Sequence, residues 1–427
     1  MRRRGVGIAL VAPALLLLWV AAPSLAGVAA PDPVPIPEPS PEAVRYNQTG
    51  LVLWFVGRAW SFVAPGLILL TGWSARIGRL AEGDGKGRGR PLVVAVALYL
   101  AIFLALEFLI NLPLRYYAGF VRPHAYGLST QSFARWLGDA AKRLGVEVVA
   151  GALFAWVPFW LMRRSPTRWW LYTGLLILPF SAFSALVVPV AVDPLFNDFG
   201  PMRDARVEAK ILALADRAGI RGGRVFEVDK SRDTTTVNAY VTGLGGTKRI
   251  VLWDTIVAKL DEDELLVVMG HEMGHYVLNH VALGIVLASL ATLVGLGVVH
   301  VAARALVARH AVRFGFDRVD RVAAVPLLMI LVQAMVLVTS PATNAASRWM
   351  EREADRFALE LTRDNHAAAT GFAKLQRDNL AVPFPDPFTL VWRSTHPSIG
   401  ARIDFCNSYR PWATGQPLRY GDRFRAP

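Results

Sequence analysis

Two histidines and a glutamate stand within five consecutive residues, His271-Glu272-Met273-Gly274-His275. On a helix, residues four apart lie about 40° apart around the axis, so both imidazoles can face one metal ion. Glu272 projects beside them, where its carboxylate can hold and deprotonate a water at that metal. This H-E-x-x-H spacing is the arrangement of zinc peptidases, and it indicates hydrolysis of peptide bonds.

A catalytic zinc site needs a third protein ligand and leaves one position open for water. Glu351 is the candidate, and Asp355 follows it by four residues, so both fall on one face of a predicted helix. An acid in that position can orient a ligand imidazole and set its tautomer. The alternative is a solvated helix in which these acids pair with Arg348 and Arg352, but the upstream histidine pair favours the metal site.

The helix that carries the histidines is predicted to begin at the acids of residues 261–264, which suit the positive N-terminus of a helix. We expect it to continue to His280, because an apolar run starts only at Val281. His280 would then lie about 140° off the ligand face, so we predict a structural or interfacial role for it. The site should lie at the membrane boundary, which favours membrane-bound, lipidated or unfolded substrates.

Two polar stretches, 193–276 and 341–427, are predicted to combine into one small α+β, zincin-like domain against membrane helices. The first stretch should contain a helix at 207–218 and short strands at 225–228 and 250–253.

An edge strand is predicted at Asn238, Ala239 and Tyr240, ahead of the metal helix. Such a strand can pair with an extended peptide substrate through main-chain hydrogen bonds and hold the scissile bond across the metal. From residue types alone, an ordinary turn and strand is the alternative.

Hydrophobic residues make up 54% of the 427-residue chain and gather in long blocks, which predicts a polytopic membrane protein with a predominantly α fold. Six blocks are long enough to cross about 30 Å of hydrocarbon, namely 50–72, 91–112, 147–162, 169–192, 277–303 and 322–340. The net charge of +13 could suggest a nucleic-acid partner, but the basic residues cluster between the apolar blocks. That distribution indicates residues that set the membrane topology and face anionic lipids of the bilayer, and it argues against a nucleic-acid partner.

The single Cys406 excludes an intramolecular disulfide and is predicted to be a packed thiol.

The N-terminus has three arginines, an apolar run from about residue 8 to 20 and small residues at 26–30, the pattern of a secretory signal or a first membrane anchor. An anchor would make seven crossings instead of six. Proline at every second position from 31 to 41 predicts an extended spacer without a fold of its own.

The chain is predicted to divide into seven segments. They are 1–30 signal or anchor, 31–45 spacer, 46–192 N-terminal transmembrane helices, 193–280 first part of the peptidase domain, 281–340 two further transmembrane helices, 341–413 second part of the peptidase domain and 414–427 basic tail.

Six ordered motifs of the chain resemble those of the type I CAAX prenyl proteases, which are integral-membrane zinc metallopeptidases. The resemblance extends from about Tyr46 to Asp404, most of the chain. The motifs are Asp193-Pro194-Leu195-Phe196-Asn197, Asn238-Ala239-Tyr240, Lys248-Arg249-Ile250-Val251-Leu252, His271-Glu272-Met273-Gly274-His275, Ser347-Arg348-Trp349-Met350-Glu351-Arg352-Glu353-Ala354-Asp355, and His396-Pro397-Ser398 with Arg402.

The resemblance implies one zinc ion per chain, with His271, His275 and Glu351 as ligands and Glu272 as general base. It also implies that Asp355 orients a ligand, and that His396 and Arg402 contact the substrate or stabilise the transition state. The family's helices enclose a large chamber with the zinc inside, which six or seven crossings permit. The resemblance further implies peptide or protein substrates, among them prenylated or misfolded membrane proteins.

Basic residues concentrate in three loops, at residues 76–90, 163–168 and 304–321. By the positive-inside rule these loops are cytoplasmic, and alternating crossings then place the metal domain on the extracytoplasmic side of the cell membrane. The eukaryotic members of the resembled family instead have catalytic domains that face the cytosol. An outward-facing enzyme would process or degrade envelope proteins, not mature prenylated ones. No feature of the sequence indicates an oligomeric state.

Other classes of protein explain parts of the pattern. A transporter or receptor with an incidental metal site would explain the helices, and zinc storage or sensing would explain the ligands without catalysis. Glu272 argues against both, because a purely structural site has no need of a carboxylate beside its first histidine and usually closes its fourth position. A catalytically inactive zinc-binding membrane chaperone or sensor would typically have lost one of the matched residues, and all of them are present.

Overall fold

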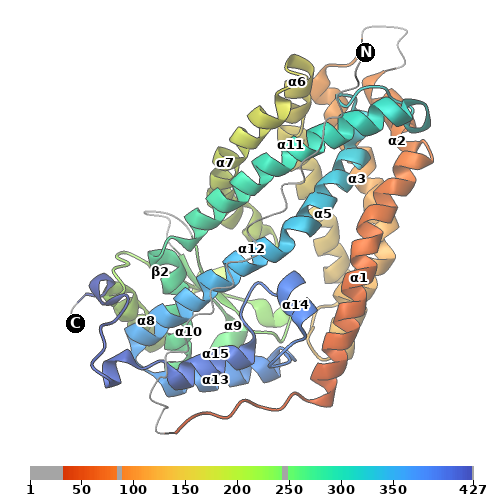
Figure 1. The fold of residues 1–427 in the computed structure, drawn as a ribbon. Coiled ribbons are helices and arrows are strands. Elements are labelled where there is room, and N and C mark those ends of the chain that lie inside the picture. Colours follow the sequence, from red (N-terminus) through yellow and green to blue (C-terminus); the bar gives the residue numbers. More distant parts are fainter. Residues whose placement is uncertain (1–31, 84–88, 243–248, 426–427) are drawn as a thin grey trace.

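The computed structural model describes residues 32–83, 89–242 and 249–425 and shows a bundle of long helices with a smaller α+β domain at one end (Figure 1). The predicted signal or anchor lies outside the described residues. Within the described residues six segments are long and apolar enough to cross a membrane, in agreement with the six predicted apart from the N-terminal one. They are α1 (Pro41–Leu70), α3 (Leu92–Tyr116) with its extension to Ala125, α5 and α6 (Phe133–Phe154 and Trp156–Arg164), α7 (Trp169–Val187) with its extension to Leu195, α11 (His280–Phe314) and α12 (Val325–Thr362).

A four-stranded sheet with the order β1-β2-β4-β3 forms one side of the α+β domain. Its strands are β1 (Phe199–Pro201), β2 (Arg224–Val228), β3 (Ala239–Thr242) and β4 (Arg249–Trp253). β2 and β4 are parallel, whereas both outer strands pair antiparallel. β3 is therefore an edge strand, as predicted, and the strands predicted at 225–228 and 250–253 correspond to β2 and β4.

The shorter helices surround this sheet and the ends of the bundle. They are α2 (Trp73–Glu82), α4 (Arg122–Ala125), α8 (Ala205–Arg217), α9 (Asp254–Lys259), α10 (Glu262–Val277), α13 (Asn365–Asp378), α14 (Pro387–Trp392) and α15 (Ile399–Ser408). One hydrophobic core joins α8, β4, α10 and α12, and its fully buried members include Ile211, Leu252, Met269, Met273 and Phe357. The sheet thus supports the back of the helix that carries the histidines.

The histidine helix α10 begins with a capping box. The Asp261 carboxylate accepts the Glu264 N–H at 3.0 Å, and the Glu264 carboxylate accepts the Asp261 N–H at 3.0 Å. The prediction that this helix continues to His280 was wrong. It ends at Val277, because Asn279 takes a left-handed backbone conformation with φ of 56°, and α11 begins at His280 with a new direction.

Helix α12 runs without a break from the membrane bundle into the α+β domain, through Pro341. It therefore crosses the boundary that we predicted between residues 340 and 341. The division of the chain into segments stays a prediction. Helices α13 and α15 pack against each other beside α10 and α12 (Figure 1). The third candidate ligand thus stands on a rigid element that is anchored at both ends.

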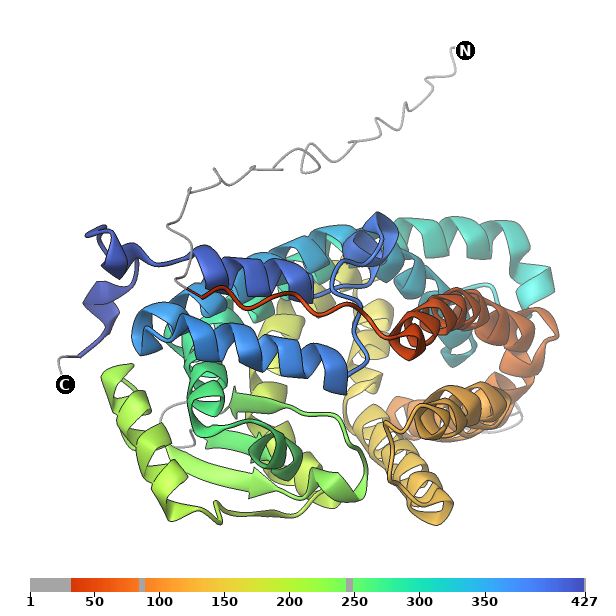
Figure 2. The same cartoon turned by 90° about the horizontal axis from the view of Figure 1, so that it is seen from below.

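Residues 32–40 of the proline-rich spacer have neither helix nor strand, as predicted, but the predicted spacer at 31–45 is too long, because α1 already begins at Pro41. The extended part is fixed to the α+β domain. The Val34 N–H donates to Asn407 Oδ1 at 3.0 Å, and Asn407 Nδ2 donates to the Val34 carbonyl at 2.9 Å. Gln376 Nε2 donates to the Pro37 carbonyl at 2.7 Å. Figure 2 shows this extended segment running along α13 and α15 before it enters α1.

The three predicted arginine-rich loops meet at the opposite end of the bundle, where α2 and α6 lie in Figure 1. Arg163 lies 3.6 Å from Glu82 and 3.8 Å from Asp320, and Arg321 lies 2.8 Å from Glu82. Each distance joins a guanidinium nitrogen to a carboxylate oxygen. These ion pairs tie α2, the end of α6 and the connection between α11 and α12 together, far from the α+β domain.

Candidate metal centre and active site

Close contact between α10 and α12 brings the candidate ligands together. A Cβ atom added to Gly274 would lie 3.1 Å from Phe357 Cβ and 3.2 Å from Ala354 Cα. One added to Gly270 would lie 3.4 Å from Ala358 Cα. Glycine at these two positions, one turn apart on α10, therefore lets the backbones approach so that side chains from both helices can share one metal.

This packing gives a prediction for Gly274→Ala. We expect it to lower the free energy of unfolding by about 1–3 kcal/mol, because the added methyl group meets the α12 backbone. Gly284→Ala in α11 is the matched control, since a Cβ there meets nothing within 4 Å. Better helix propensity alone should make that control neutral or up to about 1 kcal/mol more stable. Thermal unfolding of both variants checks this, and equal stabilisation would contradict the close-contact account.

His271, His275 and Glu351 form a group whose candidate ligand atoms all lie within 4.8 Å of one another. The two histidine Nε2 atoms are 3.2 Å apart. Glu351 Oε2 lies 3.2 Å from His271 Nε2, and Glu351 Oε1 lies 3.4 Å from His275 Nε2. Two ring nitrogens and one carboxylate thus point at a common centre, which is the prediction made from their spacing.

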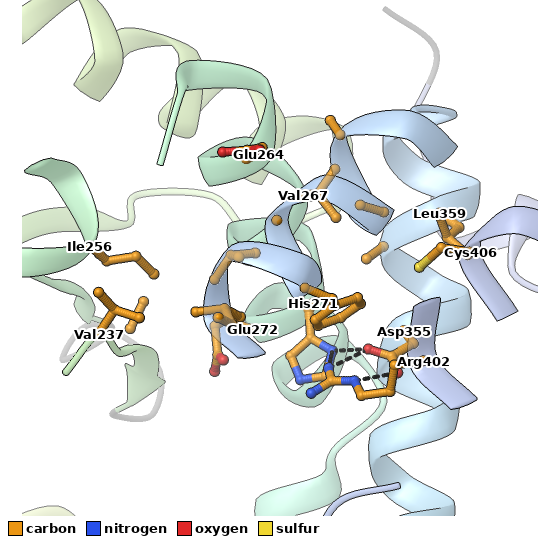
Figure 3. A pocket seen from close by; sticks show the side chains of 18 of the residues that line it. Val237, Ile256, Glu264, Val267, His271, Glu272, Asp355, Leu359, Arg402 and Cys406 are labelled. Atoms are coloured by element: carbon orange, nitrogen blue, oxygen red, sulfur yellow. Dashed lines mark hydrogen bonds and ion pairs between the residues drawn. The ribbon is translucent and has the colours of Figure 1, made fainter. Parts of the chain in front are cut away.

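The outer nitrogen of His271 is held by a buried acid. His271 Nδ1 lies 2.8 Å from Asp355 Oδ1, and Arg402 binds the same carboxylate through Nε at 2.9 Å and Nη2 at 2.5 Å (Figure 3). Asp355 is only 4% exposed, so its charge needs these partners. With the Nδ1 proton donated to Asp355, the Nε2 lone pair of His271 faces the common centre.

His275 has a corresponding partner that the sequence did not reveal. Its Nδ1 lies 3.0 Å from Nδ1 of His280, which is buried. The turn at Asn279 makes this contact possible, because a continuous helix would have placed His280 on another face. The only sequence signal was asparagine itself, which adopts the left-handed conformation more readily than most residues.

A cation fits this donor set. If both Nδ1 atoms carry their protons outward, the two Nε2 lone pairs face each other and face the Glu351 oxygens. Glu351 Oε2 is buried and accepts no hydrogen bond. Acceptors arranged this closely repel one another unless a positive ion lies between them. Two histidines and one glutamate with open coordination positions form a donor set that suits catalytic zinc.

Glu272 lines a partly open cavity of about 120 Å³ together with His271 and is not part of the ligand group. Figure 3 shows its carboxylate directed away from the pair formed by Asp355 and Arg402. Burial raises the pKa of the Glu272 carboxyl group. Asn238 and Ala239 line the same cavity, whereas Tyr240 of the predicted substrate strand does not.

The two distal residues lie in different surroundings. His396 Nε2 is 3.3 Å from Glu351 Oε1, and the His396 side chain is 56% exposed. The Arg402 side chain is only 10% exposed and is engaged by Asp355, with Nη2 3.3 Å from His271 Nδ1. His396 is thus open to a bound substrate, while Arg402 stands behind the ligand histidine. Cys406, at the far side of the cavity, is fully buried, which raises the pKa of its thiol and confirms a packed residue.

Comparisons with known proteins cover most of the chain. Residues 201–409 match the model of peptidase family M48, and residues 40–198 match that of the CAAX prenyl protease N-terminal region, described as five membrane helices. An uncharacterized metalloprotease of Bacillus subtilis, YhfN, is 36% identical over 374 residues, which is 87% of each chain. A CAAX prenyl protease 1 homolog of Dictyostelium discoideum is 29% identical and covers 73% of this chain and 72% of its own.

The crystal structure of S. mikatae Ste24p has the same fold. It superposes with a TM-score of 0.71 at 23% sequence identity and covers 85% of this chain and 87% of its own. These likenesses, together with the complete set of motif residues, do not favour the inactive chaperone or sensor. The chain belongs to peptidase family M48 and is a multi-pass membrane metalloendopeptidase.

Proposed function

We propose that this metallopeptidase binds one zinc ion through His271, His275 and Glu351 and cleaves membrane-associated proteins with Glu272 as its general base. The observation that carries the proposal is the convergence of two Nε2 atoms and a carboxylate whose outer contacts leave their lone pairs directed inward. Zinc is favoured over harder ions because histidine nitrogens supply two of the three donors.

Glu272 performs the proton transfers in this proposal. When bound, zinc supplies a Lewis acid beside the scissile carbonyl group. The Glu272 carboxylate takes a proton from the attacking water and passes it to the leaving nitrogen. Burial raises the pKa of the Glu272 carboxyl group, which makes its carboxylate a stronger proton acceptor than an exposed one.

His396 is proposed to stabilise the charge that develops on the substrate. Thr395 Oγ1 and His396 Nδ1 are 2.9 Å apart, so the threonine hydroxyl can donate to Nδ1 and leave the proton on Nε2. A carbonyl oxygen that becomes an oxyanion beside Nε2 then receives this hydrogen bond. Asp355 and Arg402 act through His271, by fixing its ring orientation and tautomer.

The substrate is proposed to lie along β3. This strand is the edge of the sheet, and Asn238 and Ala239 line the cavity that also contains Glu272. An extended peptide that pairs with β3 would therefore pass the general base with its main chain fixed. Tyr240 continues the same strand and would contact the peptide farther from the scissile bond.

His280 is proposed to fix the tautomer of His275 by accepting its Nδ1 proton. We expect His280→Leu to weaken zinc binding about 10- to 100-fold, the usual effect of losing a partner behind a ligand. His280→Asn should retain the affinity, because the asparagine Oδ1 takes the place of Nδ1. Competition with a chelator measures both variants, and equal losses in the two would refute this role.

Substrates are proposed to be lipidated or unfolded proteins of the membrane. Two relatives of this chain carry the name CAAX prenyl protease, which makes prenylated proteins one candidate class. The membrane helices continue directly into the metal site through α12, so a substrate attached to the bilayer is already near the catalytic group. Cleavage of prenylated proteins would depend on the prenyl group, whereas cleavage of unfolded membrane proteins would not.

We propose that the peptidase domain faces the extracytoplasmic side. The arginine-rich loops gather at the far end of the bundle and would be cytoplasmic. The spacer at residues 32–40 packs on the peptidase domain, so a signal or anchor that starts with cytoplasmic arginines would deliver it to the outer side. A reporter fused after Pro427 tests this, and activity of a cytoplasm-specific reporter would overturn the orientation only.

Peptide cleavage by the full chain in detergent tests the proposed function. A mixture of unstructured and farnesylated peptides is incubated with the protein, products are identified by mass spectrometry, and metal content is measured on the same sample. Zinc-dependent cleavage supports the proposal, and faster cleavage of farnesylated peptides identifies the prenylated class. No cleavage at full zinc occupancy would overturn it.

A further inference from the structure

Arg122 is a buried arginine that forms no ion pair with an acid in the described part of the chain. It is 9% exposed and lies in α4, against the first turns of α1. Its guanidinium stacks on the Tyr46 ring, with 3.7 Å between Cζ and the ring centroid, and donates to the Tyr46 carbonyl at 2.5 Å and to Thr49 Oγ1 at 3.3 Å. These contacts hold the guanidinium in one orientation and leave part of its donors unused.

Arg393 brings a second guanidinium to the same place. Measured from the position of a Cβ atom built on Gly50, Arg122 Nη2 lies at 3.1 Å and Arg393 Nη2 at 3.6 Å. Among the described residues no carboxylate forms an ion pair with either arginine. The nearby Asp386 carboxylate instead accepts the Thr389 N–H at 3.0 Å as the N-cap of α14. Two adjacent positive charges, one of them buried, favour an anion between them.

Aromatic residues beside this pair mark the level of the bilayer surface. Phe388 of α14 lies over Phe55 and edge-on to Trp54 of α1, with ring centroids 5.1 and 5.4 Å apart. Phe55 and Phe384 remain 51% and 56% exposed, so an open apolar surface lies beside the two arginines. Tryptophan and other aromatic rings gather where hydrocarbon meets head groups.

The length of α1 agrees with this level. The helix has 30 residues, whereas about 20 suffice to cross the hydrocarbon, and its apolar stretch begins at Leu51. Arg58 lies farther along α1 and reaches back toward the N-terminal end, with Cζ 5.4 Å from the Trp54 ring centroid. If the hydrocarbon layer begins at Leu51, Gly50 and the two arginines lie at the level of the lipid phosphate groups.

We infer that Arg122 and Arg393 bind the phosphate of a glycerophospholipid, with its acyl chains against Phe55 and Phe388. The guanidinium pair supplies the bidentate donors that phosphate oxygens accept, and the exposed Phe55 ring with the half-buried Phe388 ring supplies the apolar contact that a free phosphate ion lacks. The site lies outside the group of metal ligands, so it stands or fails independently of the proposed peptidase chemistry.

Binding of three probes to the full chain in detergent tests this inference. The probes are dioleoylphosphatidylglycerol, glycerol phosphate and dioleoylglycerol, which supply phosphate with chains, phosphate alone and chains alone. The lipid should form a one-to-one adduct in native mass spectrometry and raise the Tm, because a ligand of the folded state stabilises it. An equal Tm rise with glycerol phosphate or with dioleoylglycerol would overturn the lipid phosphate as the ligand.

Variants locate the site. Arg393→Gln and Arg122→Gln should each weaken lipid binding at least about tenfold, whereas Arg45→Gln, at an exposed arginine near the start of α1, should leave it unchanged. Gly50→Asp places a carboxylate between the guanidinium groups and should remove the lipid response while the fold persists. Gly50→Asn has the same shape without the charge and should retain more of the response. Undiminished binding in Arg393→Gln and Gly50→Asp would overturn the site even if Arg122→Gln fails to fold.

Discussion

Glu272→Gln is expected to lower kcat/KM for peptide cleavage by about 10²- to 10⁴-fold while the protein keeps its bound metal. The Glu272 side chain lines the cavity beside the histidines but is not one of the three converging ligands. Glutamine has nearly the same shape and cannot accept the proton of the attacking water. The change therefore removes the base and leaves the histidines, Glu351 and the packing of α10 in place.

The measurement combines cleavage rates with metal analysis of the same preparations. Asp263→Asn is the matched control, because it also neutralises an acid of α10, but at an exposed position in the first turn. The control should cleave at the wild-type rate. If Glu272→Gln retained activity with full metal occupancy, another group would have to act as the base, and the proposed mechanism would be wrong.

Features that depend on spacing within one element could be predicted from the sequence. His271 and His275 share a face because they are one turn apart, and Glu351 and Asp355 do so for the same reason. The edge position of β3 was also predicted, since its residues precede a buried strand with continuous apolar character. Local periodicity is sufficient for such statements.

Contacts that depend on a change of chain direction could not be predicted in this way. His280 meets His275 only because Asn279 reverses the local backbone twist, and periodicity assumes that the helix continues. The alternating prolines of the spacer predict an extended chain but not what that chain packs on, and Asn407 and Gln376 hold residues 32–40 through main-chain atoms of Val34 and Pro37. Arg402 was predicted near the site, but its position behind His271 depends on how α15 packs.

Glu351→Ala is expected to lower zinc affinity by a factor on the order of 10³ or more, because it removes one of the three proposed ligands and the only negative charge among them. The remaining histidines would still bind zinc weakly. Removal of any buried carboxylate can also destabilise the fold, so the loss of metal must be separated from a loss of folded protein.

Glu353→Ala makes this separation possible. Glu353 is a buried glutamate of the same helix, at 4% exposed against 7% for Glu351, but its carboxylate binds Arg356 and Tyr420, away from the ligand group. Both variants should unfold at a lower temperature than the wild type, yet only Glu351→Ala should lose zinc per folded chain. Metal content measured on the monodisperse fraction after gel filtration distinguishes them. Equal zinc retention in the two variants would exclude Glu351 as a ligand, because burial and residue type are matched and only the Glu351 carboxylate contacts the two histidines.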